Sequence, residues 1–162
     1  MERLWATWRM SYITGEKNKD GCIFCNKPQE DNDEENLILH KGKFCFIIMN
    51  LFPYNNGHIM VIPYRHIDSI ILLTEEESIE MMYFIKLMTK VIKNTMSPEG
   101  FNIGMNLGQS GGAGIAEHIH MHIVPRWAGD TNFMPVISDT RVISEHIKDT
   151  YKKLKKALLE EI

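Results

Sequence analysis

Three histidines, His118, His120 and His122, alternate with apolar residues in one short stretch of the chain. Successive side chains of a β-strand point to opposite faces, so a strand here would present all three imidazoles on one face. The residues between them, Ile119 and Met121, would face the core, and the imidazoles would face outward. The pattern therefore constrains the chain to a sheet that carries a row of histidines on one side.

Such a row has a definite chemistry. Imidazoles two residues apart lie about 7 Å from each other along a strand, and this spacing suits an extended anion. An imidazole can act as a nucleophile, a proton donor or a charged hydrogen-bond donor near neutral pH, because its ordinary pKa is about 6.5. Three of them can divide these roles along a phosphate chain. A metal site and a solvated surface cluster are the alternative interpretations.

Composition narrows the possible ligands. At 162 residues the chain fits one domain, and its net charge of −3 gives no basic excess for binding long nucleic acid. A small anion remains compatible, because a local site can be positive in an acidic protein. The amino terminus has no apolar core of signal-peptide length, and no apolar run is long enough to span a membrane. With only three cysteines in the chain, we expect a reduced, cytoplasmic protein without a membrane partner.

Two of the cysteines, Cys22 and Cys25, have the spacing of half a zinc site. Such a site needs two more ligands from elsewhere in the chain. Two unpaired thiols beside a surface loop are the alternative interpretation. Cys45 stands in an apolar run and is expected to be a buried structural thiol. The acidic run over residues 30–35 is expected to form a mobile surface loop.

The periodicity of the remaining sequence predicts an α+β domain. Strands are expected over residues 37–39, 44–49, 57–63 and 101–106, in addition to the histidine strand. His40 is expected to be a solvated turn residue between the first two strands.

Two helices are expected as well. Thr74 and the glutamates after it form a capping-box pattern that begins a long helix ending near Met96. Its buried stripe is expected to consist of Met81, Met82, Phe84, Ile85, Met88 and Ile92. The second helix is expected from about Asp139 to Glu160, with His146 inside it and without an evident role.

The histidine run is preceded by a glycine-rich stretch over residues 108–114 and followed by Pro125, Arg126 and Trp127. Together these segments resemble the signature of the histidine-triad (HIT) superfamily of nucleotidyl hydrolases and transferases. The segments over residues 44–50, 57–58 and 62–67 match the strand, loop and second strand of that family. The amino-terminal pattern with Trp5 and Trp8, and the Cys-x-x-Cys after it, look like its diadenosine tetraphosphate phosphorylase branch. The resemblance covers about residues 1–137.

The resemblance implies a HIT-like fold, in which a five-stranded antiparallel sheet is joined by a long helix and a carboxy-terminal helix. A single HIT domain over residues 1–162 would consist of an amino-terminal segment (1–36), a catalytic core (37–137) and the carboxy-terminal helix (138–162). The resemblance also implies a homodimer in which the sheets of the two subunits continue into one another. We expect the long helix and one sheet edge at that interface.

The resemblance implies roles for four histidines. His120 matches the residue that attacks the α-phosphate and forms a covalent nucleotidyl intermediate. His122 would bind phosphate oxygens or assist the leaving group, and His58 matches a further histidine of the catalytic group. His118 would orient its neighbour or ligate a metal.

The family also implies a set of substrate-binding residues. Asn50 matches the residue that holds the ribose hydroxyls, with Ile48 and Leu51 as candidate walls for the base. Asn106 matches a residue that contacts the phosphate chain, and turn formation or strand-end capping is the alternative interpretation for it. The glycine-rich stretch, with Gln109, Ser110 and Gly114, is flexible enough for its backbone amides to approach phosphates, and a plain loop is the alternative there. Ile115 stands where many members carry Ser or Thr, a departure that argues against the nucleoside phosphoramidase branch.

The resemblance finally suggests a metal and a reaction. Some bacterial members complete a structural zinc site with residues that match His66 and His118, beside Cys22 and Cys25. Mg²⁺ is a possible companion of the substrate. The expected reaction is phosphorolysis of diadenosine tetraphosphate to ADP and ATP. The alternatives are a diadenosine triphosphate hydrolase, an adenosine phosphoramidase and a regulatory protein that binds adenine nucleotides without turnover.

Overall fold

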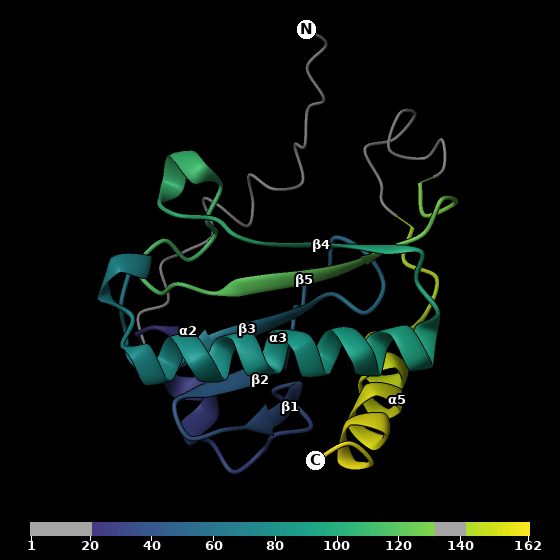
Figure 1. Ribbon diagram of the computed structural model, residues 1–162, viewed down its shortest axis with the longest axis horizontal. Helices are drawn as coiled ribbons and strands as arrows, with labels where there is room; N and C mark the ends of the chain where they lie inside the picture. Colours follow the sequence, from purple (N-terminus) through teal and green to yellow (C-terminus); the bar gives the residue numbers. More distant parts are fainter. Residues whose placement is uncertain (1–20, 132–141) are drawn as a thin grey trace, which may run out of the picture.

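A five-stranded antiparallel sheet forms the centre of the computed structural model, which describes residues 21–131 and 142–162 (Figure 1). The strands stand in the order β1-β2-β3-β5-β4. Their bounds are β1 Ile38–Lys41, β2 Cys45–Met49, β3 Ile59–Pro63, β4 Gly100–Met105 and β5 Met121–Arg126. The helices are α2 Ile23–Asn26, α3 Glu75–Met96 and α5 Ile147–Leu159, with short 3₁₀ turns at Lys27–Gln29, Ile70–Leu72 and Gln109–Gly111. The predicted α+β class with a HIT-like arrangement of strands and helices is confirmed.

Part of the expected family pattern lies outside the described residues. It comprises Trp5 and Trp8 in the amino-terminal segment, and the residues from 132 to 141 that lead to the carboxy-terminal helix. Within the described part of the chain, no helix is both long and apolar enough to cross a membrane.

The long helix α3 begins as the capping-box pattern predicts. The Thr74 hydroxyl accepts a hydrogen bond from the Glu77 amide at 3.2 Å, and the Glu77 carboxylate accepts one from the Thr74 amide at 2.9 Å. Arg65, just after β3, also donates to Glu77 at 2.7 Å, which ties the start of α3 to the sheet. The helix ends where Ser97 turns to the left-handed region with a φ of 49°, followed by Pro98.

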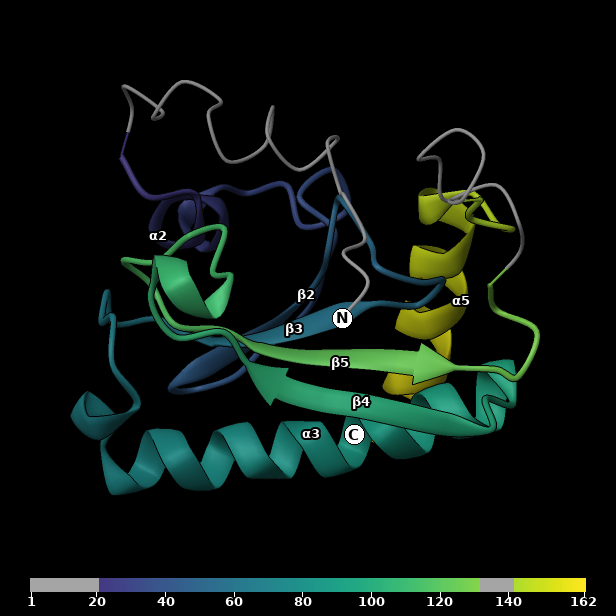
Figure 2. The same cartoon turned by 90° about the horizontal axis from the view of Figure 1, so that it is seen from above.

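The main core lies between one face of the sheet and the helices α3 and α5. Helix α3 packs against β3, β2 and β5, and Figures 1 and 2 show it running along one face of the sheet, with α5 at one end. The buried stripe of α3 contains Met81, Phe84, Ile85, Met88 and Ile92, as predicted. Met82 was expected in this stripe, but its side chain is 55% exposed because it projects from the other side of the helix.

The carboxy-terminal helix begins later than predicted. It starts at Ile147 instead of near Asp139, and His146 is its N-cap with an extended backbone at a ψ of 137°. The His146 ring accepts a hydrogen bond from the Lys148 amide at 3.3 Å. His146 therefore lies at the helix boundary and caps it, which the sequence analysis did not foresee.

The first two strands also differ from their predicted ends. His40 lies in β1 and packs edge-on against Phe84, with ring centroids 5.4 Å apart, so it is not a solvated turn residue. Glu80 of α3 accepts hydrogen bonds from the amides of Lys43, Phe44 and Cys45 at 3.0, 2.6 and 2.6 Å. These amides are held by a helix that is distant in sequence, so the strand-to-strand turn could not be read from local residues.

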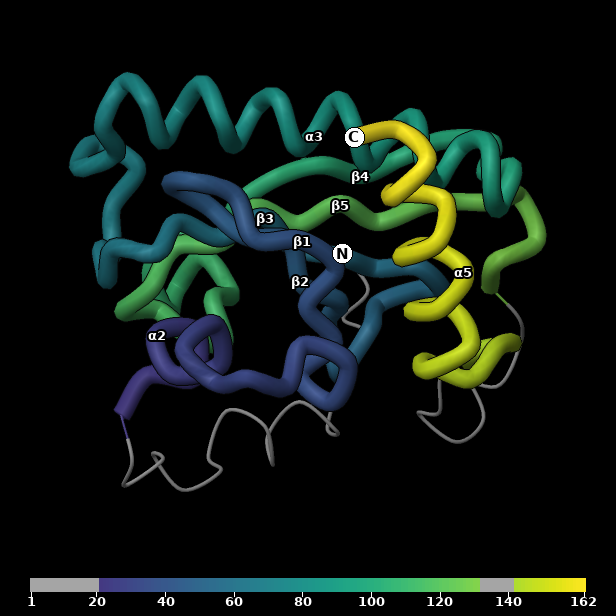
Figure 3. The backbone as a smooth tube through the Cα atoms, turned by 90° about the horizontal axis from the view of Figure 1, so that it is seen from below, coloured from purple at the N-terminus to yellow at the C-terminus, as the bar shows by residue number. Residues whose placement is uncertain are grey.

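A second, smaller core covers the opposite face of the sheet. Figure 3 shows α2 on the other side of the strands from α3. Phe24 of α2 packs there with inward-facing strand residues, namely Ile38, Phe46, Ile48, Met60 and Ile62. A four-residue helix has no apolar periodicity, which is why the sequence analysis placed no helix at Cys22–Asn26.

The histidine run lies on this second face. Two expectations about it were wrong. Strand β5 begins at Met121, so His118 and His120 precede the strand and lead into it, with the Ile119 amide donating to the Ile67 carbonyl at 2.8 Å. The imidazoles are also buried, each with at most 7% of its surface exposed, because α2 and the second core cover the face that was expected to be open.

Candidate active site

The site is built on a row of paired residues that crosses the sheet. His122 of β5 lies opposite Met60 of β3 and Gly104 of β4, and Met60 pairs in turn with Ile48 of β2. Paired residues of antiparallel strands point to the same face. A side chain at Gly104 would meet no described atom within 4 Å, so the surface beside His122 is open toward β4.

A main-chain carbonyl determines the tautomer of His120. The Nδ1 atom of His120 lies 2.8 Å from the His118 carbonyl oxygen, which can only accept a hydrogen bond. Nδ1 therefore carries the proton and Nε2 has a free lone pair. Burial lowers the pKa of His120, although the bond to the His118 carbonyl opposes this effect. His120 is thus a neutral imidazole whose Nε2 can act as a nucleophile.

A main-chain amide determines the opposite tautomer of His122. The Tyr54 amide donates to Nδ1 of His58 at 3.0 Å, so the His58 proton is on Nε2. That Nε2 lies 2.9 Å from Nδ1 of His122, which must accept and leaves the His122 proton on its own Nε2. Burial first, and then His122 and His120, lower the pKa of His58 to about 3, so His58 is neutral at neutral pH and can accept from the Tyr54 amide.

His120 and His122 stand close enough to act on one group. Their ring centroids are 4.8 Å apart in an edge-on arrangement. One ring presents a lone pair and the other an N–H donor, which is the combination needed to attack a phosphorus atom and bind its oxygens.

Phe24 covers the two leading histidines. Its ring meets His118 edge-on at a centroid distance of 5.6 Å and His120 at 5.2 Å. Phe24 itself is 3% exposed. Phe24 was not among the predicted site residues, although it stands between Cys22 and Cys25 in the Cys-x-x-Cys motif.

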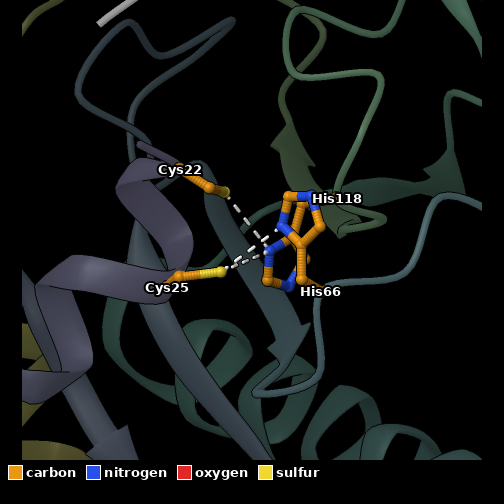
Figure 4. A group of neighbouring side chains, drawn as sticks. All are labelled: Cys22, Cys25, His66 and His118. Carbon is orange, nitrogen blue, oxygen red and sulfur yellow. Dashed lines mark hydrogen bonds between the residues drawn. The ribbon is translucent and has the colours of Figure 1, made fainter. Parts of the chain in front are cut away.

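Four of the predicted site residues form a compact group of metal-binding atoms. Cys22 and Cys25 from the start of α2 face His66 and His118, and their ligand atoms all lie within 4.8 Å of one another (Figure 4). The Sγ–Nδ1 distances are 3.4 Å for Cys22 with His118, 3.4 Å for Cys25 with His66 and 3.6 Å for Cys25 with His118. Around a tetrahedral zinc ion, sulfur and nitrogen ligands lie about 3.5 Å apart, so the group has the size that zinc requires.

His118 is held in the orientation that a metal ligand needs. Its Nε2 donates to the Pro63 carbonyl at 2.8 Å, so its Nδ1 is unprotonated and directed at the two sulfurs. Burial lowers the pKa of His118 and keeps this ring neutral. Its carbonyl meanwhile binds His120, so the two alternatives considered for His118, orienting a neighbour and ligating a metal, are compatible in one residue.

The two thiols favour a bound cation. Burial and the neighbouring Cys22 raise the pKa of Cys25 to about 11 in the absence of metal. A zinc ion deprotonates its thiol ligands and satisfies both charges. The donor set of two sulfurs and two imidazole nitrogens therefore fits structural zinc.

The predicted nucleoside-binding residues differ in accessibility. Asn50 follows β2, and its side-chain oxygen accepts from the Phe52 amide at 2.9 Å. Leu51 is 53% exposed, whereas Ile48 is almost fully buried in the second core. Leu51 is thus open to a ligand in this structure, and Ile48 lies beneath the surface.

The glycine-rich stretch forms a compact turn between β4 and the histidine run. Gly108 and Gly112 have φ angles of 68° and 89°, which favour glycine. The Asn106 amide group donates to the Gly112 carbonyl at 3.4 Å, and so anchors this turn. Gln109, Ser110 and Gly114 are exposed on it. Figures 2 and 3 place the turn at the same end of the sheet as α2.

Comparisons with known proteins agree with this geometry. The family model described as HIT domain matches residues 31–129. AP-4-A phosphorylase of Mycobacterium tuberculosis is 41% identical over 161 residues, which cover 95% of this chain and 83% of that protein.

Solved structures show the same fold. A histidine triad nucleotide-binding protein from Sulfolobus tokodaii has a TM-score of 0.67 and 26% identity, over 86% of this chain and 91% of its own. A zinc-bound histidine triad family protein from Mycobacterium smegmatis has a TM-score of 0.70 and 23% identity, over 87% of this chain and 95% of its own. The chain therefore belongs to the histidine-triad family, in the branch that is similar to AP-4-A phosphorylase.

Proposed function

We propose that this chain cleaves dinucleoside polyphosphates by nucleotidyl transfer, and that its reaction is phosphorolysis of diadenosine tetraphosphate to ADP and ATP. One observation carries the proposal: the hydrogen bond from His120 Nδ1 to the His118 carbonyl leaves Nε2 as a neutral nucleophile. Similarity to AP-4-A phosphorylase over most of the chain supports the substrate class.

In the first step, the Nε2 lone pair of His120 attacks the α-phosphorus of one adenosine. A P–N bond forms as the bond from this phosphorus to the bridging oxygen breaks, and ATP leaves with that oxygen. The Nε2–H group of His122 donates a hydrogen bond to the phosphate oxygens, where negative charge develops. The Tyr54 amide and His58 keep this donor in the required tautomer.

In the second step, an oxygen of inorganic phosphate attacks the same phosphorus. The P–N bond breaks, its electron pair returns to Nε2 of His120, and ADP is released. Water in place of phosphate would release AMP. The phosphate acceptor enters on the side that ATP has left, opposite the P–N bond, so the two displacements are separated by exchange of the leaving group for the acceptor.

The substrate would lie across the open end of the histidine face. We assign the ribose to Asn50 and the base to Leu51, with Ile48 beneath it. The phosphate chain would follow the glycine-rich turn, past half-buried Asn106 and the exposed residues Gln109, Ser110 and Gly114, where main-chain amides can approach its oxygens. Mg²⁺ would accompany the polyphosphate and reduce its charge.

We propose a structural zinc ion held by Cys22, Cys25, His66 and His118. Bound there, the metal supplies a cross-link between α2 and the histidine run and takes no part in phosphoryl transfer. The chain's own residues then act on the site: Phe24 is held over His120, and His118 keeps its carbonyl directed at Nδ1 of His120.

A product analysis tests the proposal. The protein is incubated with diadenosine tetraphosphate, with and without inorganic phosphate, and the nucleotides are separated. ADP with ATP, formed only when phosphate is present, supports phosphorolysis. AMP with ATP in both reactions would indicate a hydrolase, and binding without products would indicate a regulatory protein. Parallel reactions with diadenosine triphosphate and an adenosine phosphoramidate test the remaining enzymatic alternatives.

We also propose a homodimer. One outer side of α3 presents three large side chains at helical spacing, Ile79, Met82 and Tyr83, which are 63%, 55% and 53% exposed. Strand β4 is an edge of the sheet, and its Ile103 is 45% exposed. A second copy would cover the helix face and pair with the open edge, and the sheet would continue across the interface.

A further inference from the structure

Tyr54 lies over the hydrogen-bonded pair His58 and His122. Its ring centroid is 4.7 Å from that of His58 and 5.7 Å from that of His122, with interplanar angles of 31° and 36°. The two imidazoles are almost fully buried, whereas Tyr54 is half-buried. One aromatic ring therefore covers both partners of the His58–His122 hydrogen bond.

The same residue contacts His58 through its main chain. The Tyr54 amide donates to Nδ1 of His58, only four residues further along the chain. The loop that joins β2 to β3 thus supplies an amide that selects the tautomer and a ring that shields the imidazoles. The amide can donate only while Nδ1 of His58 is unprotonated, so its contact depends on His58 staying neutral. A ring that shields His58 from water favours the same neutral state.

We propose that Tyr54 is a positioning residue of the nucleotidyl-transfer reaction, whose ring excludes water from the His58–His122 pair and so keeps His122 as an Nε2–H donor. The loop carrying Tyr54 has a fixed attachment. The Asn55 side chain donates to the Pro125 carbonyl at 3.1 Å and to Asp130 at 2.8 Å, beyond the end of β5. The ring is therefore presented from a loop that is tied to the strand carrying His122.

The physical consequence of removing the ring follows from desolvation. Burial is the main reason for the low pKa of His58, and the titratable groups that add to it are His122 and His120. Water reaching the pair would raise the pKa of His58. A protonated His58 could no longer accept from the Tyr54 amide, because its Nδ1 would carry a proton. The His58 ring would then lose the contact that fixes its position against His122, and its Nε2–H would no longer be held on Nδ1 of His122.

Two substitutions separate the ring from the hydroxyl. Tyr54→Phe keeps the ring, and Tyr54→Leu removes it while preserving the amide. Phe44→Leu, which removes a half-buried ring packed against the main core on the other face of the sheet, is the matched control for loss of an aromatic ring. Long-range ¹H–¹⁵N correlation spectra of the free protein report the tautomers and titration of His58 and His122 in each variant.

We expect His58 to stay neutral with its proton on Nε2 down to about pH 4 in the wild type, in Tyr54→Phe and in Phe44→Leu. In Tyr54→Leu, its titration should move up by about one pH unit or more, with mixed tautomers at His122. Because the role belongs to the reaction proposed above, kcat for phosphorolysis should fall about tenfold or more in Tyr54→Leu, with KM changed less than about threefold. Tyr54→Phe should retain both parameters.

Three results would overturn the inference. The first is an unchanged His58 titration in Tyr54→Leu. The second is a rise in KM alone in Tyr54→Leu, which would make Tyr54 a substrate contact. The third is an equal loss of kcat in Tyr54→Phe, which would assign the effect to the hydroxyl. If Tyr54→Leu does not fold, Tyr54→Met is judged by the same criteria. The spectra need no substrate, so they test the shielding separately from the reaction. If the wild type showed no phosphorolysis but the His58 titration still moved in Tyr54→Leu, the proposed reaction would be contradicted and the shielding by Tyr54 would be supported.

Discussion

The different chemical roles of His120 and His122 come from main-chain groups that cannot exchange donor and acceptor. A carbonyl only accepts, so the His118 carbonyl leaves His120 with a bare Nε2. An amide only donates, so the Tyr54 amide, acting through His58, leaves His122 with a protonated Nε2. Two chemically identical side chains two residues apart thus present different atoms, a lone pair on one Nε2 and an N–H donor on the other.

Removing the nucleophile should abolish turnover and preserve the fold. His120→Gly or His120→Ala is expected to lower kcat by more than about a hundredfold, because the attacking atom is lost. Nucleotide binding should persist, since most ligand contacts remain. His122→Ala and His58→Ala should have smaller effects. Steady-state phosphorolysis and nucleotide titration measure both properties.

His146→Ala is the matched control for this series. It removes a histidine that caps α5, away from the histidine face, and should leave turnover close to that of the wild type. Retention of more than about a hundredth of wild-type turnover in the His120 variants would contradict covalent catalysis by this residue.

The neutral state of His58 also predicts a pH dependence of stability. Its pKa is about 3 in the folded protein and about 6.5 when unfolded, so the unfolded chain binds the proton first as the pH falls. The stability that neutral His58 provides is complete above about pH 6.5 and is lost progressively between about pH 6.5 and pH 3. One such group contributes a slope of at most about 1.4 kcal/mol per pH unit.

Urea unfolding at several pH values between 7 and 4 measures this slope. The free energy of unfolding of the wild type should fall more steeply with acid than that of His58→Gln, by the equivalent of about one proton. Equal slopes in the two proteins would show that His58 titrates normally in the folded state.

At the scale of elements, α2 is the segment that cannot stabilise itself. It has four residues, and its N-cap Cys22 makes no side-chain capping bond. Helices this short are not stable alone. Its position over the histidine face therefore depends on the packing of Phe24 and on the two cysteines that face His66 and His118.

The metal prediction belongs to this element. The purified protein should contain about one equivalent of zinc, and the double variant Cys22→Ser with Cys25→Ser should lose it and unfold at a lower temperature. Turnover should fall less than in His120→Ala, because the metal supports Phe24 and His118 without touching phosphate. Elemental analysis and thermal unfolding measure these effects, with Cys45→Ser as a control that leaves the metal content unchanged.

Zinc missing from protein that was purified without chelators or histidine tags would contradict the metal site. Full retention of zinc in the double variant would contradict the assignment of these ligands.

How far the elements could be predicted depended on whether their cause was local. The capping box of α3 and the alternation of the strands are local, and both were found. The start of α5 was missed because His146, an uncommon N-cap, ends a segment whose composition also suits a helix. The amides before β2 are held by Glu80 of α3, which no local pattern reveals.

The same distinction applies to the site. The histidine row and the four metal-binding residues were named from spacing and resemblance, and the structure brings the four together. Phe24 was missed because it contacts His120, which is distant in sequence. Tyr54 was missed because its contact with His58 depends on the conformation of the loop between β2 and β3. Burial of the row was missed for the same reason, since its cover is a helix without a sequence signature.

At the scale of the whole molecule, the exposed side of α3 predicts self-association. Analytical ultracentrifugation at micromolar concentration should show a dimer, because α3 exposes three large apolar or aromatic side chains and the sheet has an open strand edge at β4. Met82→Glu should weaken the dimer by placing a charge in the apolar interface. Lys152→Glu, a charge change on the exposed side of α5, is the control for charge alone. A monomeric wild type would contradict the interface.

The most direct test of the account is detection of the nucleotidyl group on His120. The protein is mixed with diadenosine tetraphosphate without phosphate, quenched in denaturant at alkaline pH during turnover, and mapped by peptide mass spectrometry. The account predicts one adenylyl group on the peptide that contains His120, its disappearance when phosphate is added before the quench, and no adduct in His120→Gly. Turnover without any adduct, or an adduct on another residue, would contradict it.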